Sequence, residues 1–225
     1  MLNYIWDITF PKQCINCSAW NLYICINCQQ QLKMTVEQRC IVCQLPSRYG
    51  FTHEYCHTND SPDRLTTIFD YRDKLVSKII NTTKLALVSE LVTELSLVAV
   101  NKIGVENMEI NNFVLCPIPM TRLKRRFRGF NQSELITKVF AQELNLPIDP
   151  LVAKSRSTKQ QKVLNKEQRQ KNLQSSFKIL YPESIPSNVI LIDDVSTTGS
   201  TFIEVAKTLK TAGVKNVWCL ALAQD

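Results

Sequence analysis

The chain has 225 residues, and its composition excludes several classes of protein. This length fits one large domain with a small additional module. Hydrophobic residues make up 44% of the chain and charged residues 21%, as in a globular protein rather than a disordered one. The longest stretch without charge, residues 13–32, is interrupted by Gln, Asn and Cys, so we expect no membrane insertion. The N-terminus lacks the pattern of a secretory signal, and we expect a cytoplasmic protein.

The formal net charge of +7 is distributed unevenly along the chain. Residues 120–180 contain fourteen Lys and Arg against four Asp and Glu, a net charge of +10, which leaves the remainder near −3. We call residues 120–180 the basic belt. A belt of this kind favours a phosphorylated or polyanionic partner.

Seven of the nine cysteines lie within residues 14–56. In a chain without an export signal, such clustering indicates metal ligands rather than disulfides. The other two, Cys116 and Cys219, lie in apolar surroundings, and we expect both to be buried in the core.

Four residue pairs, each separated by two residues, can hold two tetrahedral zinc ions, because a tight turn brings residues i and i+3 together. The predicted ligands are Cys14, Cys17, Cys25, Cys28, Cys40, Cys43, His53 and Cys56. We favour sequential use, with the first four on one ion and the last four on a second. A cross-braced arrangement is the alternative, and His57 is an alternative to His53. Residues 1–60 are therefore predicted to form a zinc-ribbon-like module, which folds around its metal and which either serves structure alone or also contacts nucleic acid or a protein partner.

Residues 61–225 alternate between strand and helix patterns. Strands are predicted at 65–71, 112–116, 177–181, 189–192 and 216–222, and helices within 73–101, 131–145 and 199–212. Asn131 and Glu134 resemble a capping box at the start of the second helical region. Residues 154–174 are polar and basic, which predicts a mobile surface segment. The alternation predicts an α/β domain with a mostly parallel sheet flanked by helices.

The apolar run at 189–192 leads directly into Asp193–Thr201, which precedes a predicted helix. A strand–loop–helix turn directs successive backbone N–H groups at one point, and the helix dipole adds positive potential, so we expect an anion there. Gly199 permits close approach of the backbone. The hydroxyl donors are Thr197, Thr198, Ser200 and Thr201. Asp193 and Asp194 suit the neighbouring diol of a sugar and a divalent cation; the alternative is a capped helix start that binds nothing.

Several motifs, taken with this loop, resemble a known family. The run ILIDDVSTTGST is similar to the ribose-phosphate signature of type I phosphoribosyltransferases. Pro117-Ile118-Pro119 followed by a basic run, Arg128-Gly129-Phe130-Asn131-Gln132, and the paired cysteines narrow the resemblance to the ComF family of competence-associated, phosphoribosyltransferase-like proteins. Further matching residues are Thr158, Gln161, Leu164, Arg169, Asn172, Leu173 and Phe177. Two departures are His53, where a cysteine is usual, and Val163, where glycine is common.

The resemblance implies a type I phosphoribosyltransferase-like fold that binds 5-phosphoribosyl 1-diphosphate with magnesium. It makes Asp193 and Asp194 the candidate catalytic residues, in contact with the ribose hydroxyls. The residues expected to hold the 5′-phosphate are Thr197, Thr198, Gly199, Ser200 and Thr201. Those expected near the diphosphate are Pro119, Arg122, Lys124, Arg125, Arg126 and Arg128. Residues 156–172 correspond to the flexible loop that closes over the site in this fold.

The implied function is a competence protein that assists the handling of single-stranded DNA during natural transformation, with other competence proteins as partners. Phe127 and Phe130, interleaved with arginines, fit a track on which bases stack. The alternative places Phe130 in the core and assigns the arginines to the small ligand. Two other functions stay open: an active phosphoribosyltransferase on an unidentified nucleobase or amine acceptor, and a sensor whose affinity for DNA or protein changes with the sugar diphosphate.

Overall fold

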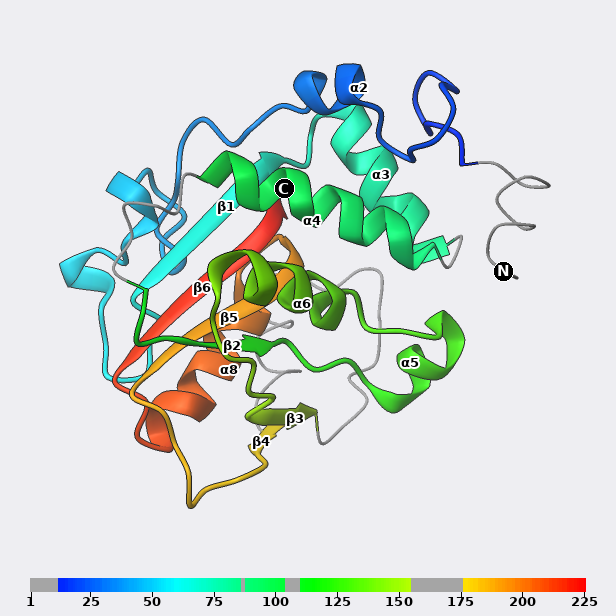
Figure 1. The fold of residues 1–225 in the computed structure, drawn as a ribbon. Helices are drawn as coiled ribbons and strands as arrows, with labels where there is room; N and C mark the ends of the chain where they lie inside the picture. The colour runs from blue at the N-terminus through cyan, green and yellow to red at the C-terminus, as the bar shows by residue number, and fades with distance from the viewer. Residues whose placement is uncertain (1–11, 86–87, 104–109, 155–175) are drawn as a thin grey trace.

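The computed structural model describes residues 12–85, 88–103, 110–154 and 176–225 (Figure 1). Its strands are β1 Arg64–Asp70, β2 Val114–Pro117, β3 Val152–Lys154, β4 Phe177–Ile179, β5 Asn188–Ser196 and β6 Asn216–Gln224. Its helices are α2 Ile26–Gln31, α3 Lys74–Leu85, α4 Ser89–Ile103, α5 Arg122–Arg128, α6 Gln132–Leu144 and α8 Ser200–Thr211, with short 3-10 turns at Arg48–Gly50 and Glu54–Cys56. The predicted flexible segment 156–172 lies outside the described residues.

Four strands form one sheet in the order β1-β6-β5-β2, and every neighbouring pair is parallel. The expected mostly parallel sheet is therefore confirmed. β3 and β4 form a separate antiparallel pair. β5 is longer than the predicted strand, because its pairing with β6 continues past Asp193, opposite Ala221, to Ser196, opposite Gln224. The two aspartates thus belong to the end of a strand rather than to the loop after it.

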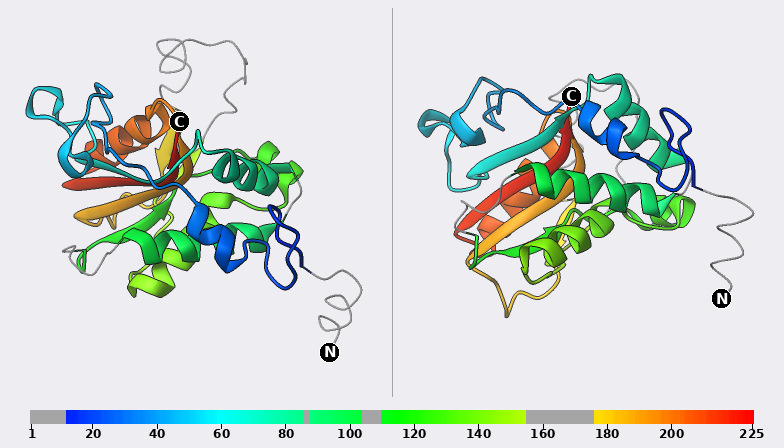
Figure 2. Two further views of the ribbon diagram at one scale, coloured as in Figure 1. Left: turned by 90° about the horizontal axis from the view of Figure 1, so that it is seen from above. Right: turned by 45° about the horizontal axis from the view of Figure 1, so that its top comes forward.

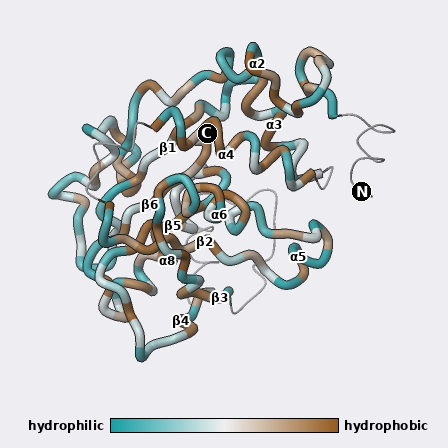
Figure 3. The backbone as a smooth tube through the Cα atoms, viewed as in Figure 1, coloured by the Kyte–Doolittle hydropathy of each residue, from teal (hydrophilic) through white to brown (hydrophobic). Residues whose placement is uncertain are grey.

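Helices cover both faces of the sheet (Figures 1 and 2). α3, α4 and α6 pack on one face, and α8 packs on the other. Successive residues of the central strands alternate between the two layers, so Ile190 and Trp218 belong to one apolar cluster and Leu191 and Val217 to the other. This double cover explains the continuous apolar run in β5, and Figure 3 shows hydrophobic residues concentrated on these strands.

The two cysteines outside the metal motifs are buried in the core, as predicted. Cys116 on β2 and Cys219 on β6 are both fully inaccessible to solvent. Burial raises the pKa of the Cys116 thiol to about 12, and burial also raises that of Cys219 well above its ordinary value. Both side chains therefore act as small protonated core residues.

Residues 12–60 lie along the β1 side of the sheet and share its core (Figure 2, blue to cyan). Ile24 and Leu32 join the apolar cluster of α3 and α4, whereas Ile41 joins the cluster beneath α8. The predicted domain boundary after residue 60 stays a prediction. No helix in the described ranges is long and apolar enough to cross a membrane.

Candidate functional site

The structure brings the predicted metal ligands together as two separate groups. The first group is Cys14, Cys17, Cys25 and Cys28, and the second group is Cys40, Cys43, His53 and Cys56. Within each group the ligand atoms all lie within 4.8 Å of one another. Four sulfurs, or three sulfurs and one imidazole nitrogen, form the donor sets that zinc prefers in tetrahedral structural sites. The residues present therefore fit zinc, in sequential rather than cross-braced pairing.

The two histidines of this region have different surroundings. His53 directs Nδ1 towards the second group, 3.3 Å from Sγ of Cys43, while Nε2 lies 3.1 Å from the carbonyl oxygen of Pro46. A backbone partner on the far nitrogen fixes the ring in the orientation that a ligand needs. His57 instead lies 3.0 Å from the carboxylate of Asp63, outside the group.

A cleft opens at the carboxyl ends of β2 and β5, the edge where α/β sheets bind ligands. It is lined by Ile118, Pro119, Met120, Thr121, Lys124, Arg128, Asn131, Gln132, Ser133, Lys154, Asp193, Asp194 and Thr201. Of the predicted site residues, Pro119, Lys124, Arg128 and Thr201 meet both aspartates there. Besides the ends of β2 and β5, four elements therefore contribute residues to this cleft: α5, α6, β3 and α8.

The two carboxylates at the end of β5 have different partners. Asp193 accepts a hydrogen bond from Ser133 Oγ at 2.8 Å and one from the Asp194 backbone N–H at 2.9 Å. Burial, with the charge of Asp194 second, nevertheless raises the pKa of Asp193 to about 7. Asp194 forms an ion pair at 3.0 Å with Lys84, from the last turn of α3.

Three cationic side chains line the cleft. Lys124 and Arg128 lie one turn apart on α5, and Lys154 ends β3. Burial lowers the pKa of Lys124, and the charge of Arg128 adds to that shift. Burial, followed by the charge of Lys124, lowers the pKa of Lys154. Crowded, partly desolvated cations of this kind favour a multiply charged anion as their partner.

The remaining predicted arginines do not line this cleft. Arg125 forms a bidentate pair with Glu134, with N–O distances of 2.8 and 2.9 Å. Arg122 and Arg126 are exposed. The arginines diverge because residues 122–128 form α5, a helix that the sequence did not predict. Glu134, expected to complete a capping box, is thus engaged with Arg125, while the Asn131 side chain accepts from Ser133 N–H as the cap.

The turn between β5 and α8 begins the helix at a left-handed glycine. Gly199 caps α8 with φ of 70°, in the left-handed region where a side chain would be strained. Thr198 Oγ1 and Ser200 Oγ lie 2.7 Å apart. Thr197 is exposed, and Thr201, in the first turn of α8, reaches the cleft. Thr201 thus brings the first turn of the twelve-residue α8 to the cleft, whereas Thr197, Thr198, Gly199 and Ser200 do not line it. Backbone N–H groups at such a helix N-terminus attract anions.

Several residues lining or flanking the cleft were missed as site residues, among them Lys84, Gln132, Ser133 and Lys154. Gln132 is buried; its Oε1 accepts from Arg128 at 3.2 Å, and its Nε2 has no hydrogen-bond partner among the described residues. A buried donor without a partner is costly, so this amide is suited to a ligand acceptor. Its position in the Arg128–Gln132 motif was the available signal. Lys84 gave none, because it meets Asp194 only through the fold.

A wider depression adjoins the cleft and shares Pro119, Met120, Thr121 and Lys154 with it. Among the described residues it encloses about 920 Å³. Apolar side chains such as Leu123, Val152 and Leu180 contribute to its walls, together with Arg122 and Arg125. Two of the predicted arginines therefore face this depression rather than the cleft.

Comparisons with known proteins agree with this architecture. A double zinc ribbon domain model matches residues 5–58, and a phosphoribosyl transferase domain model matches residues 131–225. DNA utilization protein YhgH from Escherichia coli (strain K12) is 29% identical over 95% of this chain and 98% of its own length, and the Shigella flexneri protein of that name is equally similar. Competence protein F of Haemophilus influenzae is 33% identical over 48% of this chain and 50% of its own length.

The zinc ribbon match covers both metal groups, and the phosphoribosyl transferase match covers the cleft residues from Asn131 onwards, whereas residues 118–128 of the cleft precede it. The sequence motifs, the fold and these relatives point to one assignment. The chain carries a double zinc ribbon followed by a phosphoribosyl transferase domain, and its resemblance to the ComF family of competence-associated proteins is confirmed.

Proposed function

We propose that the cleft binds 5-phosphoribosyl 1-diphosphate with magnesium, and that the protein acts in competence by assisting the handling of single-stranded DNA. The observation that carries the first part is the convergence of three features on one cleft. The turn before α8 contributes Thr201 to this cleft, beside two carboxylates and three cations. Such a turn suits the 5′-phosphate, carboxylates suit the ribose diol, and cations suit the diphosphate.

The individual residues support defined roles. The turn from Thr197 to Thr201 binds the 5′-phosphate through backbone N–H and hydroxyl groups. Asp193 and Asp194 accept hydrogen bonds from the ribose hydroxyls, and their oxygens suit magnesium, which when bound would neutralise charge on the diphosphate. Lys124, Arg128 and Lys154 face the same anion.

A crystal soaked with the sugar diphosphate and magnesium tests this assignment. The proposal places the 5′-phosphate at residues 197–201, the ribose hydroxyls within hydrogen-bond distance of Asp193 and Asp194, and the diphosphate near Lys124. Gln132 Nε2 should donate to a ligand oxygen, since it has no partner in the described structure. Density for the ligand elsewhere, with the turn empty at saturating concentration, would contradict the proposal.

The DNA-handling part rests on the names of the relatives and on the outer face of α5. Phe127 is 77% exposed, whereas Phe130 packs against the core. One of the two expected aromatic rings is therefore available for stacking, and Arg122 and Arg126 of the same helix are also exposed. Aromatic and cationic side chains together bind single strands without sequence preference.

Salt titrations of labelled single-stranded DNA test this part. Binding should weaken steeply with salt, and Arg126→Glu should weaken it more than Lys138→Glu, the same charge reversal at an exposed position of α6. Equal effects of the two variants would mean that α5 is not the DNA-binding surface. Binding that does not depend on salt would contradict an electrostatic contact with DNA.

A second function, transfer of the phosphoribosyl group to an acceptor, is favoured by the depression beside the cleft. Its apolar walls could receive a nucleobase or amine next to the bound sugar. Diphosphate release with a panel of acceptors tests this function. Release above the spontaneous rate that disappears in Asp193→Asn/Asp194→Asn would establish a transferase, and its absence with every acceptor would leave binding alone.

A further inference from the structure

The second metal group touches the phosphate-binding turn through one side chain. Ile41 lies between two of the ligands of that group, Cys40 and Cys43, and is fully buried. It packs so closely on Gly199 that a Cβ built there would lie 2.8 Å from Cγ1 of Ile41. That separation is shorter than side-chain carbons adopt. Glycine is therefore needed at position 199 for two reasons: it adopts the left-handed backbone conformation, and it leaves room for Ile41.

The position of Ile41 is fixed by the turn that carries the ligands. The Gln44 backbone N–H donates to the Cys40 carbonyl at 2.9 Å, and Gln44 Nε2 donates to the Ile41 carbonyl at 2.7 Å. A metal ion on Cys40 and Cys43 would close this turn, because both thiolates would bind one centre. Ile41 then projects from the turn into the apolar cluster with Phe202 and Val205 of α8.

The rest of this ribbon is attached along the outer edge of β1. The Gln38 side chain donates to the Thr67 carbonyl at 2.7 Å and accepts from the Thr67 N–H at 2.9 Å, as a neighbouring strand would. A Cβ on Gly50 would overlap the carbonyl oxygen of Leu65. These close contacts hold the ribbon against the sheet that carries the turn.

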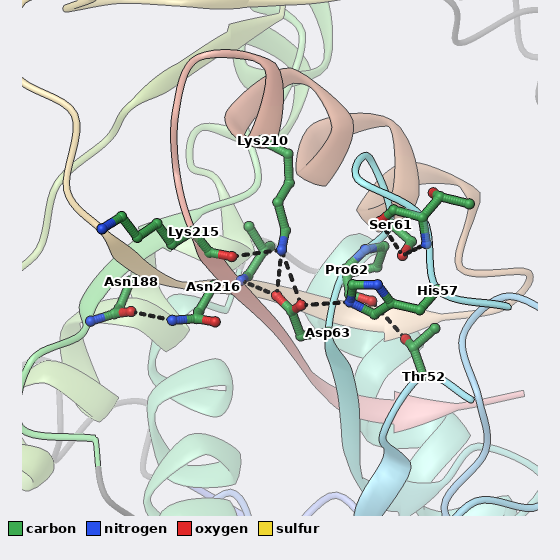
Figure 4. Close-up of polar contacts among 11 residues, drawn as sticks. Thr52, His57, Ser61, Pro62, Asp63, Asn188, Lys210, Lys215 and Asn216 are labelled. Atoms are coloured by element: carbon green, nitrogen blue, oxygen red, sulfur yellow. Dashed lines mark hydrogen bonds and ion pairs between the residues drawn. The ribbon is translucent and has the colours of Figure 1, made fainter. Parts of the chain in front are cut away.

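A polar network just before the start of β1 adds to this attachment (Figure 4). The Asp63 carboxylate accepts from Lys210 of α8 at 2.8 Å, from the Val217 backbone N–H at 2.6 Å and from His57 at 3.0 Å. His57 follows the ligand Cys56 directly in sequence. The second ribbon is thus linked to both ends of α8: Ile41 packs on Gly199 at its N-terminus, and Lys210 in its last turn shares Asp63 with His57.

The first metal group has no such contact with the turn among the described residues. Cys14 and Cys28 pack in the cluster of α3 and α4. Glu94 of α4 accepts hydrogen bonds from the backbone N–H groups of Tyr23 and Ile24 at 3.2 and 2.8 Å. Among the described residues, this ribbon is related to the cleft indirectly, through α3, whose last turn carries Lys84, and through α4, which packs on α6.

We infer that Ile41 is a positioning residue for the phosphate-binding turn and that metal bound by the second group holds it there. The two metals then have different consequences: loss of the second loosens the turn, and loss of the first leaves it intact. The inference rests on the proposed function only for the identity of the ligand. The contact between Ile41 and Gly199 stands without it.

Matched ligand variants separate the two groups. Cys17→Ser and Cys43→Ser change equivalent positions, the second cysteine of the first pair in each group. Each variant should lose one zinc per chain by elemental analysis. Cys43→Ser should weaken binding of the magnesium complex of 5-phosphoribosyl 1-diphosphate about tenfold, within the usual range of coupling between sites. Cys17→Ser should stay within about twofold of the unmodified protein, as for independent sites.

Hydrogen exchange supplies a readout that needs no ligand. In the ligand-free protein, amides of residues 197–203 should exchange faster in Cys43→Ser than in Cys17→Ser. If the unmodified protein does not bind the sugar diphosphate, the proposed function fails, and the exchange experiment still decides the coupling. Equal exchange at the turn in both variants would overturn the inference, whatever the binding result.

Variants that retain both metals test Ile41 itself. Ile41→Ala should weaken ligand binding, and Ile41→Val, which keeps the branched Cβ, should restore most of the affinity. Leu209→Ala removes a buried side chain from the same cluster at the far end of α8, so it controls for lost stability. Equal ligand affinity in Ile41→Ala and Leu209→Ala at full zinc content would overturn the assignment of Ile41.

Discussion

The two zinc-ribbon groups have the same spacing in their first cysteine pair, yet they support different parts of the molecule. The first group packs against α3 and α4, away from the turn proposed to bind phosphate. The second lies along β1 and places Ile41 against Gly199. The ligand sets alone would assign both groups the same structural role. The difference comes from what each ribbon contacts. The ligand residues identify a metal-binding site, and the packing around it shows which part of the molecule the metal supports.

The largest difference should appear when the anchor of the second ribbon is removed. Asp63→Ala leaves the Lys210 ammonium, whose side chain is 9% exposed, without its carboxylate partner. Breaking such a pair costs about 3–5 kcal/mol, and urea unfolding should show the loss. The double variant Asp63→Ala/Lys210→Met should recover much of it. An unchanged midpoint for Asp63→Ala would mean that this network does not fasten the ribbon.

The anchor of the first ribbon should matter less. Glu94→Ala removes an acceptor from two backbone N–H groups but leaves no unpaired charge on them. Loss of such hydrogen bonds costs about 1–3 kcal/mol. Hydrogen exchange should rise at residues 22–25 and stay unchanged at residues 197–203. Glu94→Gln, which keeps one acceptor oxygen, is the matched control and should lie between. Faster exchange at the turn would break the proposed separation of the two ribbons.

The pH dependence of the cleft is expected to be smaller and to originate in β5. Because the pKa of Asp193 is raised to about 7, the folded protein binds more protons than the unfolded chain between about pH 4 and that value. The stability of the ligand-free protein should therefore fall as pH rises through this window. Affinity for the magnesium-bound ligand should rise about tenfold from pH 6 to 8, as Asp193 ionises.

Asp193→Asn is the control for both pH effects. Unfolding midpoints at pH 5 and 8 should converge in this variant, and the rise of affinity with pH should vanish. A pH profile that survives the substitution would assign the titration to another group.

The smallest expected effect concerns the indirect connection of the first ribbon to the cleft. Lys84→Met removes the ion-pair partner of Asp194, in a pair whose side chains are 24% and 19% exposed. Solvent screens such a pair, so ligand affinity should change by no more than a few-fold. Calorimetry on Lys84→Met beside Ile41→Ala would sharpen the comparison. A larger effect for Lys84→Met would make α3, and thus the first ribbon, the dominant connection.

Local patterns in the sequence were sufficient to predict most of the fold and about half of the residues that line the cleft. The apolar run of β5 and the hydroxyl-rich turn after it are contiguous, so strand, turn and helix could be predicted together. The two cysteine groups could be predicted equally well, because the spacing of the ligands is a local property of the sequence. α5 was missed because it is short and buries no residue. Its two apolar residues, Leu123 and Phe127, are exposed, so the segment lacks the apolar stripe by which a packed helix is predicted.

The contacts that complete the cleft could not be predicted from local patterns. Lys84 meets Asp194, and Ile41 meets Gly199, only after the sheet and the second ribbon have assembled. The extension of β5 past Asp193 likewise depends on the matching length of β6. Such long-range pairings produce no characteristic residue spacing in the sequence. For the same reason the sequence could not distinguish Arg128, which lines the cleft, from the arginines that α5 directs elsewhere.

Calorimetric titration of the zinc-loaded protein with 5-phosphoribosyl 1-diphosphate and magnesium tests the central claim most directly. The account predicts saturable binding at one site per chain that is lost in Asp193→Asn/Asp194→Asn and retained in Cys17→Ser. No heat of binding at millimolar ligand, from protein with its full zinc content, would contradict the assignment of the cleft.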